Sequence, residues 1–199
     1  MSDIGDESDF NSTRHNGGFS NISEAYVSKS GFTRMFSAVR YGKRYMLKCL
    51  KPDFAYTPIY RQALMKEFEI GLQLDHPNIC RTISMEPVGE LGDCIVMEYV
   101  DGETLEAAVK GGNMTEDKVR KIASQLLDAM EYMHAKQTVH RDIKPSNIML
   151  THRGGDVKLI DFGLSDSETF CVLKIPAGTI GYMAPEQLQP GAKSDPCAD

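Results

Sequence analysis

The most informative segment of the sequence is His140-Arg141-Asp142-Ile143-Lys144-Pro145-Ser146-Asn147, which follows a long amphipathic segment. Asp161-Phe162-Gly163 begins nineteen residues after Asp142, and Ala184-Pro185-Glu186 comes later in the chain. A single aspartate is usually a turn carboxylate or a helix cap, so one such motif would be weak evidence. Three motifs in this order indicate one functional constellation, because chance would rarely place all of them together.

The amphipathic segment before this stretch predicts a helix over residues 116–135. Thr115 is a good N-cap, and Glu116 and Asp117 in the first turn oppose the helix dipole. The apolar stripe of this helix consists of Val119, Ile122, Ala123, Leu126, Leu127, Met130 and Met133. A methionine-bearing binding surface is the alternative, but one clean face at helical spacing is typical of a helix that faces a core.

The part of the chain before this helix is predicted to be strand-rich. Residues 1–18 are rich in Asp, Ser, Asn and Gly, and we expect a disordered acidic tail there. Alternating apolar residues predict antiparallel strands within 25–50, joined by a turn at Tyr41-Gly42-Lys43. A helix is predicted over 60–74, followed by strands around 81–87 and 93–100.

Composition excludes several classes of protein. The sequence has 199 residues, with 22 Lys and Arg against 28 Asp and Glu, so its formal net charge is −6. A protein that coats nucleic acid needs a basic face, so we expect no nucleic-acid partner. No apolar run approaches the ~18 residues of a membrane helix, and the acidic start does not resemble a secretory signal. The five cysteines are scattered, without a C-x-x-C pair, so we expect reduced thiols and a cytoplasmic localisation.

The three motifs resemble the catalytic core of protein kinases, and the resemblance covers about residues 25–195. It implies the two-lobe α+β kinase fold, with a domain over 19–199. The antiparallel sheet and one helix would form an N-lobe over about 22–100, and a partial helical C-lobe would follow over 101–199. Lys144, and Thr179 with Tyr182, match the serine/threonine class. The resemblance therefore implies transfer of phosphate from ATP, with Mg²⁺, to Ser or Thr hydroxyls of proteins.

The resemblance also implies a role for each residue of the central motifs. Asp142 would accept the proton of the substrate hydroxyl or orient that hydroxyl, and Lys144 would contact the γ-phosphate. Asn147 and Asp161 would supply hard oxygen ligands to Mg²⁺. Phosphoryl transfer needs positioning and charge neutralisation more than covalent help, which explains these residue types. His140 and Phe162 are interpreted as packing residues.

A second charged pair is implied upstream. Tyr45-Met46-Leu47-Lys48 resembles the strand whose lysine binds the α- and β-phosphates, and Glu67 would be its helix partner. Family spacing favours both assignments. Lys43 and Lys51 remain alternatives for the lysine, and Glu69 remains an alternative for the acid.

The nucleotide site implied by the resemblance departs from the family pattern. Ser28, Ser30 and Thr33 occupy the three glycine positions of the phosphate-covering loop, which ends near Met35, and Phe32 matches its aromatic tip. Met46 replaces a small alanine against adenine. We therefore expect weak ATP binding, because side chains restrict close backbone approach to phosphates. The remaining implied contacts are the gatekeeper Met97, the Glu98 carbonyl, the Val100 amide and Met149 beneath the adenine.

Residues 161–186 resemble the activation segment. Arg141 is the residue that would bind a phosphorylated form of this segment. Ser165, Ser167 and Thr169 are candidate acceptors. An unmodified polar loop is an equally good interpretation for each of them.

Two further departures weaken the resemblance. Gly71 stands where relatives carry a bulky apolar residue facing the Phe of the Asp-Phe-Gly motif. Asp195 would begin a helix that 196–199 do not continue, so we expect a truncated domain. An uncovered stripe on the helix over 116–135 would then favour aggregation or chaperone binding. A non-catalytic binding module is the rival function. A small-molecule kinase is a second rival, which the complete Thr179–Glu186 segment disfavours.

Overall fold

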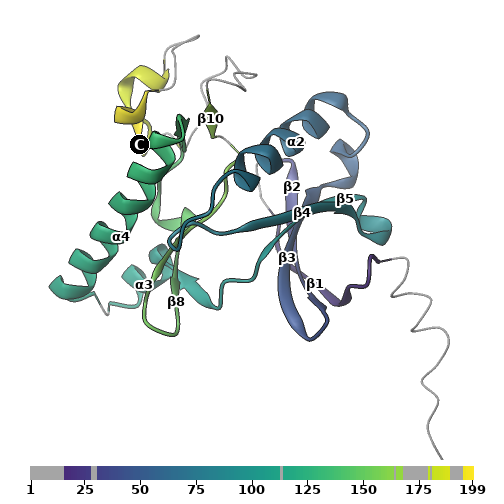
Figure 1. The fold of residues 1–199 in the computed structure, drawn as a ribbon, viewed down its shortest axis with the longest axis horizontal. Helices are drawn as coiled ribbons and strands as arrows, with labels where there is room; N and C mark the ends of the chain where they lie inside the picture. Colours follow the sequence, from purple (N-terminus) through teal and green to yellow (C-terminus); the bar gives the residue numbers. More distant parts are fainter. Residues whose placement is uncertain are drawn as a thin grey trace, which may run out of the picture. The chain divides into compact units, whose positions relative to one another are not determined.

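The computed structural model describes residues 16–27, 31–112, 114–163, 165–167, 179, 181–188 and 195–199. Its backbone contacts divide the chain into two compact units. Unit 1 comprises residues up to 68 together with 82–99, and unit 2 comprises 69–81 and 100–199. Residues 69–81 therefore group with unit 2, although the sequence assigned them to the strand-rich lobe. Figure 1 shows the elements of both units.

Unit 1 contains the antiparallel sheet that the sequence predicts, and the strand order is β1-β2-β3-β5-β4. The strands are β1 (Ser20–Val27), β2 (Thr33–Arg40), β3 (Lys43–Leu50), β4 (Thr82–Pro87) and β5 (Asp93–Glu98). The β2–β3 turn is confirmed: Tyr41 and Gly42 have φ of 51° and 74°. Positive φ at both central residues is typical of two-residue hairpin turns. Residues 16–18, expected in the tail, form a turn, and 1–15 lie outside the described residues.

The strand register gives the sheet two distinct faces, because opposed residues in antiparallel strands point the same way. One face carries Met35, Met46, Lys48, Ile95 and Met97. The other face carries Phe36, Leu47, Cys49, Cys94 and Val96. This second face is buried in a core cluster that also contains Phe19 and Val88. Lys48 and the core thiols therefore lie on opposite sides of the same sheet.

Helix α2 (Pro58–Leu72) begins and ends two residues before the predicted helix over 60–74. Pro58 begins the helix because its fixed φ and missing N–H suit the first helical turn. After Leu72 the chain turns, and the Gln73 amide donates to the Ile70 carbonyl at 3.1 Å. Short 3₁₀ turns, η1 (Pro52–Phe54) and η2 (Gly89–Leu91), complete the connections of unit 1.

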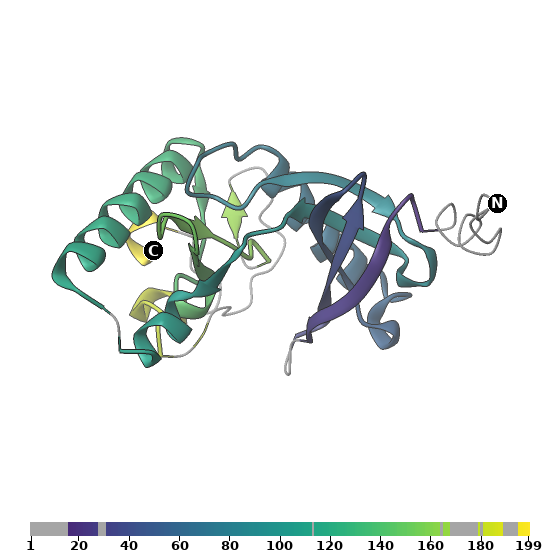
Figure 2. The ribbon, with the colours of Figure 1, turned by 90° about the horizontal axis from the view of Figure 1, so that it is seen from below.

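Unit 2 is built around α4 (Glu116–Ala135), whose bounds match the prediction. The Thr115 Oγ1 accepts a hydrogen bond from the Lys118 amide at 3.3 Å, as expected of an N-cap. The other elements are β6 (Gly102–Thr104), α3 (Leu105–Lys110), β7 (Thr138–Val139), η3 (Pro145–Asn147), β8 (Ile148–Thr151), β9 (Val157–Leu159), β10 (Asp166–Ser167), η4 (Pro185–Leu188) and η5 (Pro196–Ala198). Helix α4 packs against β7 and β9 (Figures 1 and 2).

The apolar stripe of α4 is only partly buried. Ile122 and Met133 join the core of unit 2 with Phe162, whereas Val119 and Leu127 are 49% and 63% exposed. Interpreting the whole stripe as core is therefore wrong for its outer edge. We expected an uncovered apolar stripe on this helix to favour aggregation. Val119 and Leu127 are exposed members of that stripe, and self-association of the chain stays a prediction. Among the described residues, no helix is long and apolar enough to span a membrane.

Candidate active site

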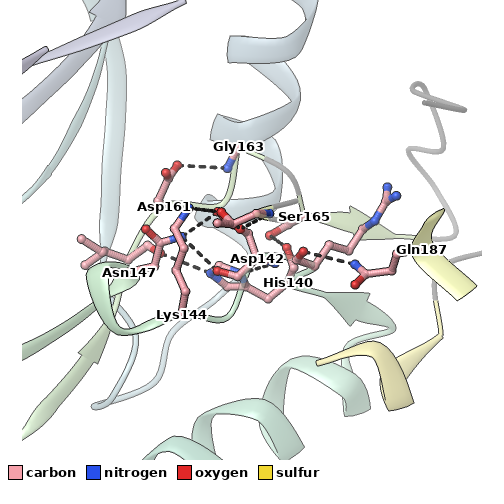
Figure 3. A network of polar contacts seen from close by, with 11 residues as sticks. His140, Asp142, Lys144, Asn147, Asp161, Gly163, Ser165 and Gln187 are labelled. Carbon is pink, nitrogen blue, oxygen red and sulfur yellow. Dashed lines mark hydrogen bonds and ion pairs between the residues drawn. The ribbon is translucent and has the colours of Figure 1, made fainter. Parts of the chain in front are cut away.

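The carboxylate of Asp142 is the centre of the polar network in unit 2 (Figure 3). Asp142 is only 7% exposed. Its Oδ2 accepts hydrogen bonds from Lys144 Nζ at 2.5 Å and from Asn147 Nδ2 at 3.0 Å. Its Oδ1 accepts from the amide and the hydroxyl of Thr179, at 3.1 and 2.8 Å. The structure thus brings together three residues that the sequence singled out and adds Thr179 as a direct partner.

The loop that carries Asp142 is closed by local contacts. Asn147 Nδ2 also donates to the Asp142 carbonyl at 2.9 Å, which links the two ends of the motif. The Asn147 amide donates to the Lys144 carbonyl within η3, and the Asn147 carbonyl accepts from the Ile160 amide, both at 2.9 Å. The position of the Asp142 carboxylate is therefore set by the folded backbone and not by its side-chain partners alone.

Asp199 anchors the same loop from the C-terminal end of the described chain, and sequence reasoning missed it. Its Oδ2 accepts from the His140 amide at 2.7 Å, and its Oδ1 accepts from the Arg141 amide at 2.6 Å. His134 Nε2 lies 3.0 Å from Oδ2, and the Asp199 side chain is 1% exposed. Arg141 has φ of 71°, an unfavourable conformation for a residue with a side chain, so the loop needs such an anchor.

Asp195, where the resemblance begins a helix that residues 196–199 do not continue, differs from Asp199 in its contacts. Asp195 is exposed and caps the short turn η5, where its Oδ1 accepts from the Cys197 amide at 2.8 Å. Pro196 opens this turn, and the turn ends before a helix can form. No local motif identifies Asp199, because its partners lie 58 and 59 residues earlier in the chain.

Gln187 is a second residue that sequence reasoning missed. It is 7% exposed, and its Nε2 donates to the Arg141 carbonyl at 3.2 Å. Its Oε1 accepts from the Ala184 amide at 2.7 Å. Gln187 therefore connects the Ala184-Pro185-Glu186 motif to the loop of Asp142. The only feature of the sequence that could have pointed to Gln187 as a site residue is its position directly after that motif.

His140 is a packed residue, as the sequence predicted. It is fully buried, and its ring lies 5.4 Å from that of Phe162. His140 Nε2 lies 3.2 Å from the Ile160 carbonyl, which can only accept, while the Asp142 amide donates to Nδ1 at 3.3 Å. These partners require the neutral tautomer with its proton on Nε2. Burial holds the pKa of His140 below its ordinary value of 6.5, against the smaller opposing effects of Asp199, Asp161 and Asp142.

We expect this histidine to make folding stability dependent on pH. In the unfolded chain His140 takes up a proton below its ordinary pKa of 6.5, whereas the folded chain resists protonation there. The free energy of unfolding should therefore fall as the pH drops through 6.5, by at most about 1.4 kcal/mol per pH unit from this group. Urea unfolding between about pH 7.5 and pH 5.5 measures it. Equal slopes for the chain and for His140→Asn would contradict the expectation.

Asp161 and Asn147 supply the oxygen atoms that suit a magnesium ion. Asp161 is exposed and has φ of 67°, and its Oδ1 accepts from the Gly163 amide at 3.3 Å. The side-chain nitrogen Nδ2 of Asn147 already donates a hydrogen bond to Asp142. The side-chain oxygen of Asn147 is therefore the atom that would bind a metal. Within the described ranges, no three His, Cys, Asp or Glu side chains form a metal cluster. Magnesium commonly binds one or two carboxylates together with substrate phosphates.

In unit 1, Lys48 pairs with Glu67. The Lys48 Nζ lies 2.5 Å from the Glu67 Oε1, and both side chains are 6% exposed. Lys43 is exposed, and Glu69 is only half-buried. The geometry therefore favours Lys48 and Glu67 over the alternatives that the sequence left open. Removing one member of such a buried pair is strongly destabilising, because the other charge stays buried.

The residues of the implied nucleotide site fall in both units. In unit 1, Met35, Met46 and Met97 share the sheet face of Lys48, and Thr33 begins β2 two residues before Met35. Glu98 ends β5. Val100 and Met149 belong to unit 2, Met149 within β8. Ser28 and Ser30 lie outside the described residues.

Phe32, which the resemblance places at the tip of the phosphate-covering loop, packs against other aromatic rings. Its ring lies 5.1 Å from that of Tyr60 on α2, and Tyr60 in turn contacts Phe54 at 4.7 Å. The Lys51 amide donates to the Phe32 carbonyl at 2.8 Å. The chain before β2 is therefore fastened to the aromatic cluster at the start of α2. This is a packing role that the sequence did not predict.

Ser165, one of the candidate phosphorylation sites, lies in a packed position. Ser165 is 2% exposed, and its hydroxyl donates to the His140 carbonyl at 3.4 Å. This hydroxyl is covered in this conformation, and phosphorylation of Ser165 stays a prediction. The backbone of Ser167 pairs with Thr138 in the β10–β7 ladder, and Thr169 lies outside the described residues.

The family comparison agrees with this geometry. The model of the protein kinase domain matches residues 29–199, so the chain belongs to the protein kinase family. It is 41% identical over 151 residues to mitogen-activated protein kinase kinase 9 of Arabidopsis thaliana, covering 72% of this chain and 46% of that protein.

Two bacterial relatives are similar over comparable lengths. The chain is 33% identical to a probable serine/threonine-protein kinase of Streptomyces coelicolor, covering 85% of this chain and 27% of that protein. It is 36% identical to serine/threonine-protein kinase PrkC of Bacillus subtilis, covering 73% and 23%. The chain therefore spans less than half the length of these relatives. Family membership implies ATP, a divalent metal and protein substrates in general.

Proposed function

We propose that the domain transfers the γ-phosphoryl group of ATP to serine or threonine hydroxyls of proteins. The observation that carries the proposal is the Asp142 carboxylate, which is held by Lys144, Asn147 and Thr179. A buried carboxylate in a fixed orientation can orient an incoming hydroxyl and accept its proton. The printed names of the bacterial relatives, which are serine/threonine-protein kinases, support this class of acceptor.

The other charged residues serve positioning and neutralisation in this proposal. Lys144 holds Asp142 through one hydrogen bond and Thr179 through another at 2.7 Å, and it would meet the γ-phosphate. Lys48, kept in place by Glu67, would bind the α- and β-phosphates. Asn147 and Asp161 would hold Mg²⁺, which neutralises charge on the β- and γ-phosphates when bound. Such preorganised charges are a large part of catalysis of phosphoryl transfer.

The direct test is transfer of labelled phosphate from ATP to a generic basic protein. We compare the chain with Asp142→Asn, which keeps the size of the side chain and removes its charge. Label above background with the parent chain and none with the variant supports the proposal. Equal label in both would contradict it, because another group would then carry the reaction. Phosphoamino-acid analysis of the product reports whether serine, threonine or tyrosine was the acceptor.

A nucleotide-binding or partner-binding module without catalysis is the second candidate. The absence of glycine at the Thr33 position and the methionine at position 46 favour it. Binding of ATP without any transfer, by the parent chain and by Asp142→Asn alike, would support this candidate. The two functions are therefore separated by the same pair of proteins.

We expect weak binding of ATP with magnesium. Met46 lies on the sheet face of Lys48, where its side chain crowds the implied adenine position. Affinity should be poorer than the range of about 1 μM to 1 mM that is common for enzyme substrates. Met46→Ala should bind more tightly, because it removes three heavy atoms from that face. Isothermal calorimetry measures both, and low-micromolar binding by the parent chain would show the steric argument to be wrong.

We also propose a cytoplasmic localisation. The thiols of Cys49, Cys94 and Cys197, which are reduced in the structure, support it, since structural disulfides are common in oxidising compartments and rare in the cytosol. Fluorescence microscopy of a tagged chain tests the proposal.

A further inference from the structure

Two buried cysteines face each other across the sheet of unit 1. Cys49 on β3 and Cys94 on β5 are directly opposed in the antiparallel register. Both side chains are 0% exposed and belong to the same apolar cluster. They lie on the face opposite Lys48, so the proposed phosphoryl transfer does not use them.

The register places these cysteines within reach of a disulfide. Directly opposed residues in antiparallel strands have Cα atoms about 4.5 to 5.5 Å apart. Disulfides span Cα separations of about 4.4 to 6.8 Å, which include this separation. The Cβ atoms, usually about 4.5 to 5.5 Å apart in such pairs, must approach by up to about 1 Å, which requires only a small shift of the two strands.

The surroundings give the two thiols different reactivities. The neighbouring Cys94 side chain, together with Arg34, lowers the pKa of Cys49, against burial and the charge of Glu24, while the Cys94 thiol donates to the Gly92 carbonyl at 3.4 Å. Arg34 is the cross-strand partner of Cys49 on β2. The interaction with Cys49, burial and the charge of Asp93 raise the pKa of Cys94. Cys49 is therefore the nucleophilic thiol of the pair, and Cys94 stays protonated beside it.

We propose that Cys49 and Cys94 form an oxidisable dithiol, which a hydroperoxide converts into a disulfide between β3 and β5. The Cys49 thiolate attacks the peroxide, the O–O bond breaks, and the leaving oxygen takes up a proton. Cys94 then displaces the hydroxyl of the resulting sulfenic acid, and water leaves as the S–S bond forms. The sum is two thiols and one hydroperoxide giving a disulfide, an alcohol or water, and one further water.

Burial determines how this reaction proceeds. Phe19 and Val88, which are 1% and 0% exposed, pack in the same cluster as the two thiols. A small oxidant such as hydrogen peroxide reaches the thiols only when this layer opens, so the reaction should be slow. The product would tie β3, the strand of Lys48, covalently to β5.

The experiment treats the reduced 199-residue chain with hydrogen peroxide and then blocks the remaining thiols. Non-reducing peptide mapping by mass spectrometry should find Cys49 joined to Cys94, with the loss of two hydrogen masses, and dithiothreitol should reverse it. The oxidised chain should melt roughly 5–10 °C higher than the reduced chain, because the bond closes a long loop.

Matched variants and an unfolded control make the result decisive. Cys197→Ser, at an exposed position, should form the same link. Cys94→Ser should form none and should leave Cys49 as a sulfenic acid that dimedone traps. Oxidation in urea should give mixed pairings, since the register is then lost. No Cys49–Cys94 link in the folded chain, or the same pairings in the folded and urea-treated samples, would overturn the proposal. Because this readout needs neither ATP nor transfer, it can fail or succeed independently of the proposed kinase function.

Discussion

Replacing Asp142 by alanine, or Asp161 by alanine, should lower phosphoryl transfer by at least about 10³-fold in any preparation that shows transfer. Losing a positioned base or a preorganised charge typically costs factors of about 10² to 10⁴. Asp142 has four hydrogen bonds that fix its carboxylate, and Asp161 supplies a hard oxygen for the metal. Initial rates of label transfer at saturating ATP measure the effect.

The acids of α2 provide the matched control for this experiment. Glu67→Ala should strongly reduce transfer, because it leaves the buried Lys48 without its partner at 2.5 Å. Glu69→Ala, two residues along the same helix and only half-buried, should leave the rate within about twofold. Activity that survives Glu67→Ala but not Glu69→Ala would mean that the helix register is shifted by two residues. Thermal melting of both variants separates loss of fold from loss of function.

The elements that the sequence predicted well are those whose signals are local. Helix α4 matches at both ends because Thr115 caps it and an apolar period runs through it. The β2–β3 hairpin follows from the Tyr41-Gly42 turn. The pairing of Lys48 with Glu67 needed family spacing as well, because Glu69 has the same charge on the same helix. Burial, which depends on the folded sheet and helix, then distinguishes the two acids.

The features that the sequence missed depend on contacts between distant residues. Whether Val119 and Leu127 of the α4 stripe are covered depends on neighbouring elements, and a periodic pattern cannot specify these. Gln187 acts through the Arg141 carbonyl, 46 residues away in the chain. Ser165 belongs to a polar segment that reads as a modifiable loop, yet its hydroxyl is buried against the His140 carbonyl. Polar residues in loops are thus the least predictable part of the site.

Asp199 is the strongest case of such a distant contact, and we expect Asp199→Ala to lower the free energy of unfolding by about 3–5 kcal/mol. Hydrogen bonds to a charged group contribute roughly 1.5–3 kcal/mol each, and Asp199 accepts from two backbone amides as well as contacting His134. A loss of this size is a large part of the total stability of a domain, about 5–15 kcal/mol.

The variants Asp199→Asn and Asp195→Ala distinguish a specific anchor from a general effect of terminal changes. An asparagine oxygen can accept one of the two amides, but its NH₂ group faces the other donor, so its effect should be large as well. Asp195→Ala removes only the exposed cap of η5 and should change stability by less than about 1 kcal/mol. Hydrogen exchange of the His140 and Arg141 amides should accelerate in both Asp199 variants and stay slow in Asp195→Ala. Unchanged exchange in Asp199→Ala would show that the positive φ of Arg141 is maintained by the loop itself, with Gln187 and Asn147 as sufficient supports.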